Sequence, residues 1–191
     1  MSDVNELKTL DENTRKAVSR VAAEYKYAKD LEKELEKIEG EEDPKKANKE
    51  VKNAFHILRW VGRAERRVDH DEKKILKGLE EIGEILPENL KTKEEKLHEK
   101  LEDAEQKVVT LSSMFTGKVK KELKDIKLDE SLLEEYEKNS KKTEEIRVHL
   151  RDLLKDVEIH VKELITWIEA TVVILRQIEG FEETLDKLSK S

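Results

Sequence analysis

The chain has 191 residues, of which 45% are charged and 4% aromatic, and it carries a formal net charge of −7 without any Cys. The lack of Cys excludes disulfides, thiolate zinc sites and cysteine nucleophiles, and 6 Gly and 2 Pro leave few turn residues for a β fold. Because apolar residues recur at helical intervals, we expect an all-α domain over 1–191 rather than disorder.

The first predicted helix covers about residues 3–39, and Gly40 is placed to end it. After an acidic loop, Asp43 and Pro44 supply an N-cap and a first helical residue. The second helix then covers residues 44–86 and stops at Pro87. Its apolar seam keeps a heptad register, which is typical of a helical bundle or coiled coil. The short connection predicts that the two helices form a long antiparallel hairpin.

Two further helices are predicted after the hairpin. The third covers residues 92–126, starts at a capping box of Thr92 and Glu95, and has a kink near residues 112–117. The fourth covers residues 129–189 and has the broadest apolar face. Trp60 and Trp167 are expected to be packing anchors between the second and fourth helices. A homodimer would be one way to cover apolar seam that the bundle leaves open.

A row of basic residues follows the second helix, two positions before each seam residue. It consists of Lys45, Lys49, Lys52, His56, Arg59, Arg63, Arg66, His70, Lys73 and Lys77. A two-residue offset turns a helix by about 200°, so this basic row is expected to face solvent for about 48 Å, opposite the seam. Like charges on successive turns destabilise a helix, and surfaces normally mix both signs.

Three interpretations of the basic row are open: a solvated or self-associating face, a nucleic-acid-binding face, and a face for an acidic protein or anionic membrane surface. Nucleic acid would be bound through its phosphates, because stacking aromatics are few and no base-reading fold is evident. The predicted polyanion-binding residues are Lys45, Lys49, Lys52, Arg59, Arg63, Arg66, Lys73 and Lys77.

Carboxylates interrupt the apolar seams at Glu24, Glu65 and Glu72. Inward carboxylates can bind metal pairs in helical bundles, but that design needs Glu-x-x-His on two helices, and the residues from Glu95 to His98 are the one match. The simpler interpretation is an ion pair between Glu65 and Arg20 that sets the register of the hairpin.

No catalytic spacing or cofactor motif is present, so we expect a non-catalytic interaction or scaffold protein without a cofactor. Its second helix would present the basic row to a polyanion, and a structural coiled-coil protein that oligomerises is the alternative. The start of the chain lacks the apolar core of a signal peptide, and the most apolar stretch, 164–175, is too short for a membrane span. We therefore expect a cytoplasmic protein, with a Lys- and Glu-rich composition like that of thermophile proteins.

Overall fold

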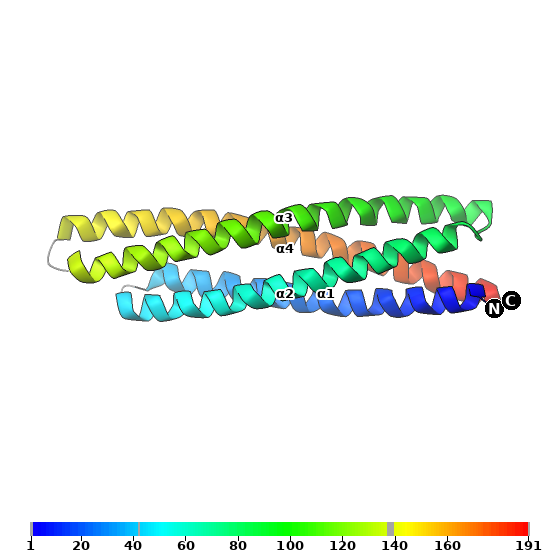
Figure 1. Cartoon of the computed structure of the whole chain (residues 1–191), viewed down its shortest axis with the longest axis horizontal. Coiled ribbons are helices and arrows are strands. Elements are labelled where there is room, and N and C mark those ends of the chain that lie inside the picture. The colour runs from blue at the N-terminus through cyan, green and yellow to red at the C-terminus, as the bar shows by residue number, and fades with distance from the viewer. Residues whose placement is uncertain (1, 42, 137–139, 191) are drawn as a thin grey trace. The chain divides into compact units, whose positions relative to one another are not determined.

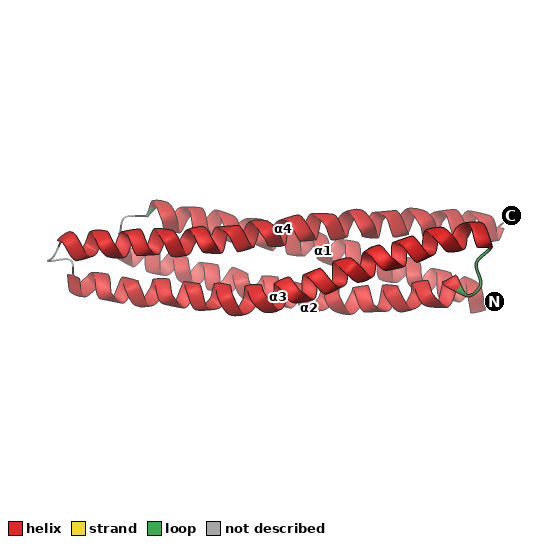
Figure 2. Ribbon diagram, turned by 90° about the horizontal axis from the view of Figure 1, so that it is seen from above, coloured by secondary structure: helices red, strands yellow, loops and turns green. Residues whose placement is uncertain are grey.

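The structure is a computed structural model that describes residues 2–41, 43–136 and 140–190. These residues form four helices: α1 (Ser2–Gly40), α2 (Pro44–Gly83), α3 (Glu88–Tyr136) and α4 (Ser140–Lys190) (Figure 1). The described residues contain no strand (Figure 2). The prediction of an all-α helical bundle is therefore confirmed.

The first two helices begin and end close to the predicted positions, and α2 does start at Pro44. Gly40 ends α1 without adopting a positive φ, so it is not the left-handed cap that the sequence suggests. At its other end α2 stops at Gly83, before the expected 86. A residue that precedes Pro is disfavoured in helical conformation, and a turn forms there instead, with the Ile85 N–H donating to the Ile82 carbonyl at 3.0 Å.

The third helix begins at Glu88, four residues before the expected Thr92. The N–H groups of Leu90 and Lys91 donate to the carbonyl of Pro87 at 3.0 and 2.9 Å, so the first turn forms directly on the proline. Thr92 therefore lies inside α3 and does not cap it.

The backbone of α3 continues as a helix through residues 112–117 and on to Tyr136. The predicted start of a fourth helix at 129 is therefore wrong, whereas the kink near 112–117 stays a prediction, because a helix can bend without being interrupted. A single Gly such as Gly117 costs a helix about 1 kcal/mol, which a long packed helix tolerates when no Pro follows. The side chains of 111–116 lie outside the described part of the chain.

The chain divides into two compact units. Unit 1 consists of Met1–Tyr25, Arg63–Thr110 and Thr166–Ser191, and unit 2 consists of Lys26–Gly62 and Leu111–Ile165. Each unit contains a part of all four helices. The single domain over 1–191 stays a prediction.

Unit 1 is a bundle in which each helix has a side-chain contact with the next. The contacts are Arg20 with Asp71 (α1 and α2), Glu80 with His98 (α2 and α3), Lys107 with Trp167 (α3 and α4), and Thr14 with Glu182 (α4 and α1). The core between them is aliphatic and includes Leu10, Val21, Val68, Ile75, Leu79, Leu101, Leu175 and Ile178. Its α2 members, Val68, Ile75 and Leu79, each lie two positions after a member of the basic row, where the sequence predicts the apolar seam.

In unit 2, α1 lies between α2 and α4. Tyr27 of α1 stacks with Trp60 of α2. Glu158 of α4 lies close to Glu39 of α1, and burial and then Glu39 raise its pKa. The buried apolar residues include Leu31, Leu35, Val51, Leu58, Val61, Val161 and Leu164. The α2 residues among them, Val51, Leu58 and Val61, lie two positions after members of the basic row, where the sequence predicts the apolar seam.

Two helical glycines allow a test of how tightly α2 packs. An added Cβ at Gly62 would meet nothing within 4 Å, so Gly62→Ala is expected to raise the free energy of unfolding by about 1 kcal/mol. At Gly78 the same Cβ would lie 3.0 Å from Cδ1 of Leu10, so Gly78→Ala is expected to gain less. Urea unfolding of both variants measures the difference, and an equal gain at the two positions would contradict the packing described for unit 1.

Candidate polyanion-binding face

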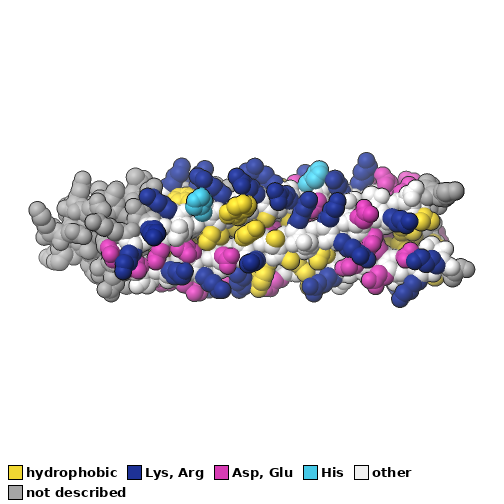
Figure 3. Space-filling view, turned by 90° about the horizontal axis from the view of Figure 1, so that it is seen from below, with side chains coloured by type: hydrophobic (Ala, Val, Ile, Leu, Met, Phe, Trp, Pro, Cys, Tyr) yellow, Lys and Arg dark blue, Asp and Glu magenta, His cyan; other side chains and the backbone are white. Residues whose placement is uncertain are grey.

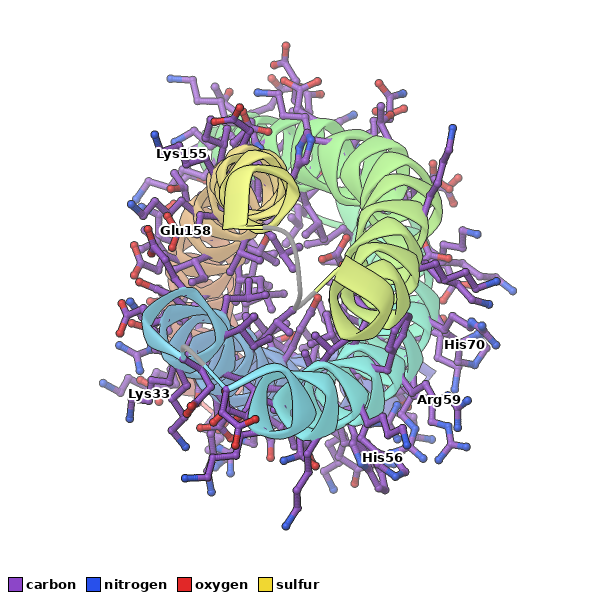
Figure 4. The ribbon with its side chains drawn as sticks, turned by 90° about the vertical axis from the view of Figure 1, so that its left-hand side faces the viewer. Lys33, His56, Arg59, His70, Lys155 and Glu158 are labelled. Carbon is purple, nitrogen blue, oxygen red and sulfur yellow. The ribbon has the colours of Figure 1, made fainter. Side chains whose placement is uncertain are left out.

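The basic row of α2 faces away from the core in both units. In unit 2 the side chains of His56 and Arg59 point outward, and in unit 1 that of His70 does so too (Figure 4). Every row member from Lys49 onward is exposed: Lys49, Lys52, His56, Arg59, Arg63, Arg66, His70, Lys73 and Lys77. The side chain of Lys45 lies outside the described residues. In Figure 3, Lys, Arg and His side chains follow one another along one edge of the view.

Up to Lys77 the acidic residues of α2 are buried or half-buried, whereas Glu80 and Glu81 near its end are exposed. In unit 1, Glu65, Asp71 and Glu72 are buried, while Arg63 and Arg66 on the same helix are exposed. In unit 2, residues 44–62 contain one acidic residue, Glu50, which is half-buried and interacts electrostatically with Glu41 and Glu34. From Lys49 to Lys77, α2 therefore carries its acidic residues at buried or half-buried positions and its basic row at exposed ones.

Within the described part of the chain, the basic row is little neutralised by ion pairs. Lys73 pairs with Asp69 one turn away, with 3.2 Å between Nζ and Oδ2. Lys49, Lys52, Arg59 and Arg66 form no ion pair with any described carboxylate. Their charges are therefore available to an external anion.

A cluster of carboxyl groups occupies the core of unit 1. This carboxyl cluster consists of Glu24 from α1, Glu65, Asp69 and Glu72 from α2, and Glu105 from α3. Glu24, Glu65 and Glu72 are at most 1% exposed. Among the described residues, neither carboxyl oxygen of Glu72 has a hydrogen-bond partner. Buried carboxylates without partners are strongly disfavoured, so protons are expected to remain on this cluster.

The pKa values of the carboxyl cluster follow from this burial. Burial, and then the neighbouring Glu65 and Glu72, raise the pKa of Glu24 to about 9. Burial, and then Glu105 and Asp69, raise the pKa of Glu72 to about 8. Both groups are therefore protonated at neutral pH, and they contribute no negative charge that would offset the basic row of the same unit.

The predicted ion pair between Arg20 and Glu65 is wrong. Arg20 instead binds Asp71 with one nitrogen, Nη1, which lies 2.7 and 2.9 Å from the two carboxylate oxygens. Arg20 therefore binds a residue six positions further along α2 than a reversal at Gly40 predicts. Glu65 lies close to Glu24 instead and, after burial, contributes to raising the Glu24 pKa.

The carboxyl cluster raises the metal-binding alternative again, since metal-binding helical bundles bring carboxylates together from several helices. Among the described residues, however, no group of three or more His, Asp or Glu is arranged to hold a metal ion. His98 lies beside Glu80, with 3.4 Å between Nε2 and Oε1, and Glu95 is exposed. The Glu-x-x-His match therefore does not join the cluster.

The sequence predicts that the two tryptophans anchor α2 to α4, but their contacts are with other helices. Trp60 is 49% exposed and stacks on Tyr27 of α1, with ring centroids 6.0 Å apart and an interplanar angle of 26°. Trp167 lies in unit 1, where the ammonium of Lys107 is 4.6 Å from its ring centroid. The stacking of Trp60 on Tyr27 beside the basic row was not predicted. Hydrophobic periodicity predicts a wide apolar arc on α2, but it does not show which side of this arc a neighbouring helix covers.

Comparison of the chain with protein-family models, with curated proteins and with solved structures finds no match. In the described parts of the four helices, no segment combines the length and the hydropathy needed to cross a membrane. The proposal below therefore depends on the geometry and charge of the side chains alone.

Proposed function

We propose that this protein is a non-catalytic interaction module that binds the phosphate backbone of nucleic acid through the basic row of α2. The observation that carries the proposal is the separation of charge on α2 from Lys49 to Lys77: the basic row is exposed, while the acidic residues are buried or half-buried and in part protonated. Exposed cations along a helix attract a linear polyanion, because each phosphate contact releases condensed counterions.

The overall charge of −7 does not oppose this binding strongly. Salt screens charges beyond about 8 Å at physiological ionic strength, so a phosphate at the surface of α2 experiences mainly the row beside it. Contacts of this kind would be independent of sequence, because Lys and Arg that bind phosphates do not read bases. An extended interaction surface fits a scaffold or binding role.

Charge reversal tests the proposal in unit 2, where Lys49, Lys52 and Arg59 become Glu. The affinity for a 20-base-pair duplex, measured by fluorescence anisotropy at low salt, is expected to fall at least about tenfold. The slope of log K against log salt concentration is expected to decrease in magnitude by about 3, since each lost phosphate contact removes about 0.9. The corresponding unit 1 variant, in which Arg66, Lys73 and Lys77 become Glu, is expected to behave similarly.

The control variant reverses three exposed lysines of α3 in unit 1, Lys91, Lys96 and Lys100. It has the same net charge as the unit 2 variant but keeps the basic row, so it should bind duplex within about threefold of the native chain. Equal losses for the row variants and the control would show that only net charge matters. The absence of any binding at low salt would refute the proposal and favour a solvated or self-associating face.

A further inference from the structure

An exposed Trp60, stacked on the half-buried Tyr27, lies next to the basic row in unit 2. Trp60 is 49% exposed, although indole is the largest apolar side chain and is usually well covered in a folded domain. Tyr27 supports one part of the indole, with the two rings stacked at 26° to each other. The indole of Trp60 therefore stacks on Tyr27 and keeps apolar surface open to solvent.

The position of Trp60 on α2 places it beside two members of the basic row. His56 precedes it by four residues, so the two side chains are neighbours on one face of the helix. Arg59 precedes it by one residue, and both His56 and Arg59 point outward (Figure 4). The only acidic residue in 44–62, Glu50, is half-buried. The surroundings of the exposed indole on α2 are therefore cationic.

We infer that Trp60, supported by Tyr27 and flanked by His56 and Arg59, is a stacking site for an unpaired base of single-stranded nucleic acid. An aromatic ring beside a cationic track is the arrangement that binds single strands, because every base has a π face and every linkage has a phosphate. In a nucleic-acid duplex, neighbouring base pairs cover the faces of each base. Only the basic row, and not the ring of Trp60, can therefore contact a duplex. This inference rests on the proposed function, and it names the form of nucleic acid that is preferred.

An anionic membrane surface fits the same residues less well. Insertion into lipid needs a set of exposed apolar side chains that enter together. Among the described residues of α2 in unit 2, Trp60 is the only exposed large hydrophobic side chain, and its ring already stacks on Tyr27. A single indole that stacks on Tyr27 is suited to contact one flat ring, such as a base, rather than a lipid surface.

The fluorescence of Trp60 provides the test. The chain has 2 Trp, so Trp167→Phe leaves Trp60 as the only indole. In this variant, a single-stranded oligo(dT) of twenty residues is expected to quench the emission on binding. A duplex of the same length and heparin, which has no bases, are expected to leave the emission nearly unchanged even where they bind. Vesicles of phosphatidylserine and phosphatidylcholine are the fourth probe.

Substitution at Trp60 in the native chain gives an independent measurement. Trp60→Ala is expected to weaken oligo(dT) binding about tenfold and to change duplex binding less than twofold, while Trp60→Phe retains most of the single-strand affinity. Thermal unfolding of each variant confirms that the fold is kept, and Trp60→Phe preserves the ring if Trp60→Ala unfolds.

The outcomes separate the two proposals. One outcome is that single strand and duplex bind equally, that charge reversal weakens the binding of both, and that Trp60→Ala changes neither. In that case the basic row binds nucleic acid, but the proposed stacking site is wrong. If no nucleic acid binds at low salt, both proposals are wrong. Emission that shifts with vesicles and not with oligo(dT) would overturn the single-strand assignment in favour of a lipid surface.

Discussion

Raising the pH from 5 to 9 is expected to destabilise the protein steeply, and Glu72→Gln is expected to remove part of this loss. Glu72 has a pKa of about 8 in the folded chain, against an ordinary value of 4.5. Between these two values the folded state holds a proton that the unfolded state has released. Stability is therefore fully present below pH 4.5, and it falls as the pH rises toward the folded pKa.

The size of the effect follows from proton linkage. Each group of this kind lowers the free energy of unfolding by about 1.4 kcal/mol per pH unit across its window. Glu24, with a pKa of about 9, adds a second contribution over a longer range. At pH 8 the cost attributable to Glu72 alone is about 4 kcal/mol, a large fraction of the stability of an ordinary domain.

Urea unfolding at pH 5, 6, 7, 8 and 9 measures this dependence. For Glu72→Gln, the unfolding free energy should fall less steeply with pH between pH 5 and 8. The difference from the native slope should be about 1.4 kcal/mol per pH unit, which corresponds to one proton. Glu99→Gln, an exposed change on α3, is the control and should keep the native slope. A native chain that is as stable at pH 9 as at pH 5 would show that the carboxyl cluster is not buried as described.

The second large effect is expected at the ion pair between Arg20 and Asp71. The Asp71 side chain is 6% exposed, whereas that of Arg20 is 40% exposed. Arg20→Ala therefore leaves a buried carboxylate without its cation and is expected to cost about 3 kcal/mol. Asp71→Ala should cost less, because the remaining guanidinium can reach water. The double variant is expected to recover part of the loss from Arg20→Ala.

A double-mutant cycle by urea unfolding at pH 7 checks this asymmetry. The control is the exposed pair of Arg15 and Asp11 on α1, whose side chains are 63% and 32% exposed. Arg15→Ala should cost less than about 0.5 kcal/mol, as is usual for surface pairs. Equal costs for Arg15→Ala and Arg20→Ala would mean that Arg20 and Asp71 do not form a buried pair.

The helical seams could be predicted from sequence because burial repeats with the period of the helix. The buried residues Val51, Ala54, Leu58 and Val61 recur at steps of three and four. The same geometry predicts that the basic row two positions earlier faces water. A continuous charged row is visible in a sequence for the same reason that a continuous apolar seam is: both depend on angle around one helix axis.

Contacts between helices could not be predicted in the same way. The partner of Arg20 depends on the register that the α1–α2 connection imposes, and an error of six residues replaced Asp71 with Glu65. The support of Trp60 by Tyr27 depends on which flank of α2 is covered by α1. The uninterrupted course of α3 could not be predicted from the low helix propensity of residues 112–117.

Folding of this chain takes up protons from neutral solution. Glu24, Glu72 and Glu182 all keep a proton well above the pH at which an unfolded chain would release it, and Thr14 lies 3.0 Å from the Glu182 carboxyl. The native molecule at pH 7 is consequently about three charges less negative than a count of its acidic and basic residues suggests. Its isoelectric point should lie above the sequence value of 5.5, and its electrophoretic mobility should be lower than the composition implies.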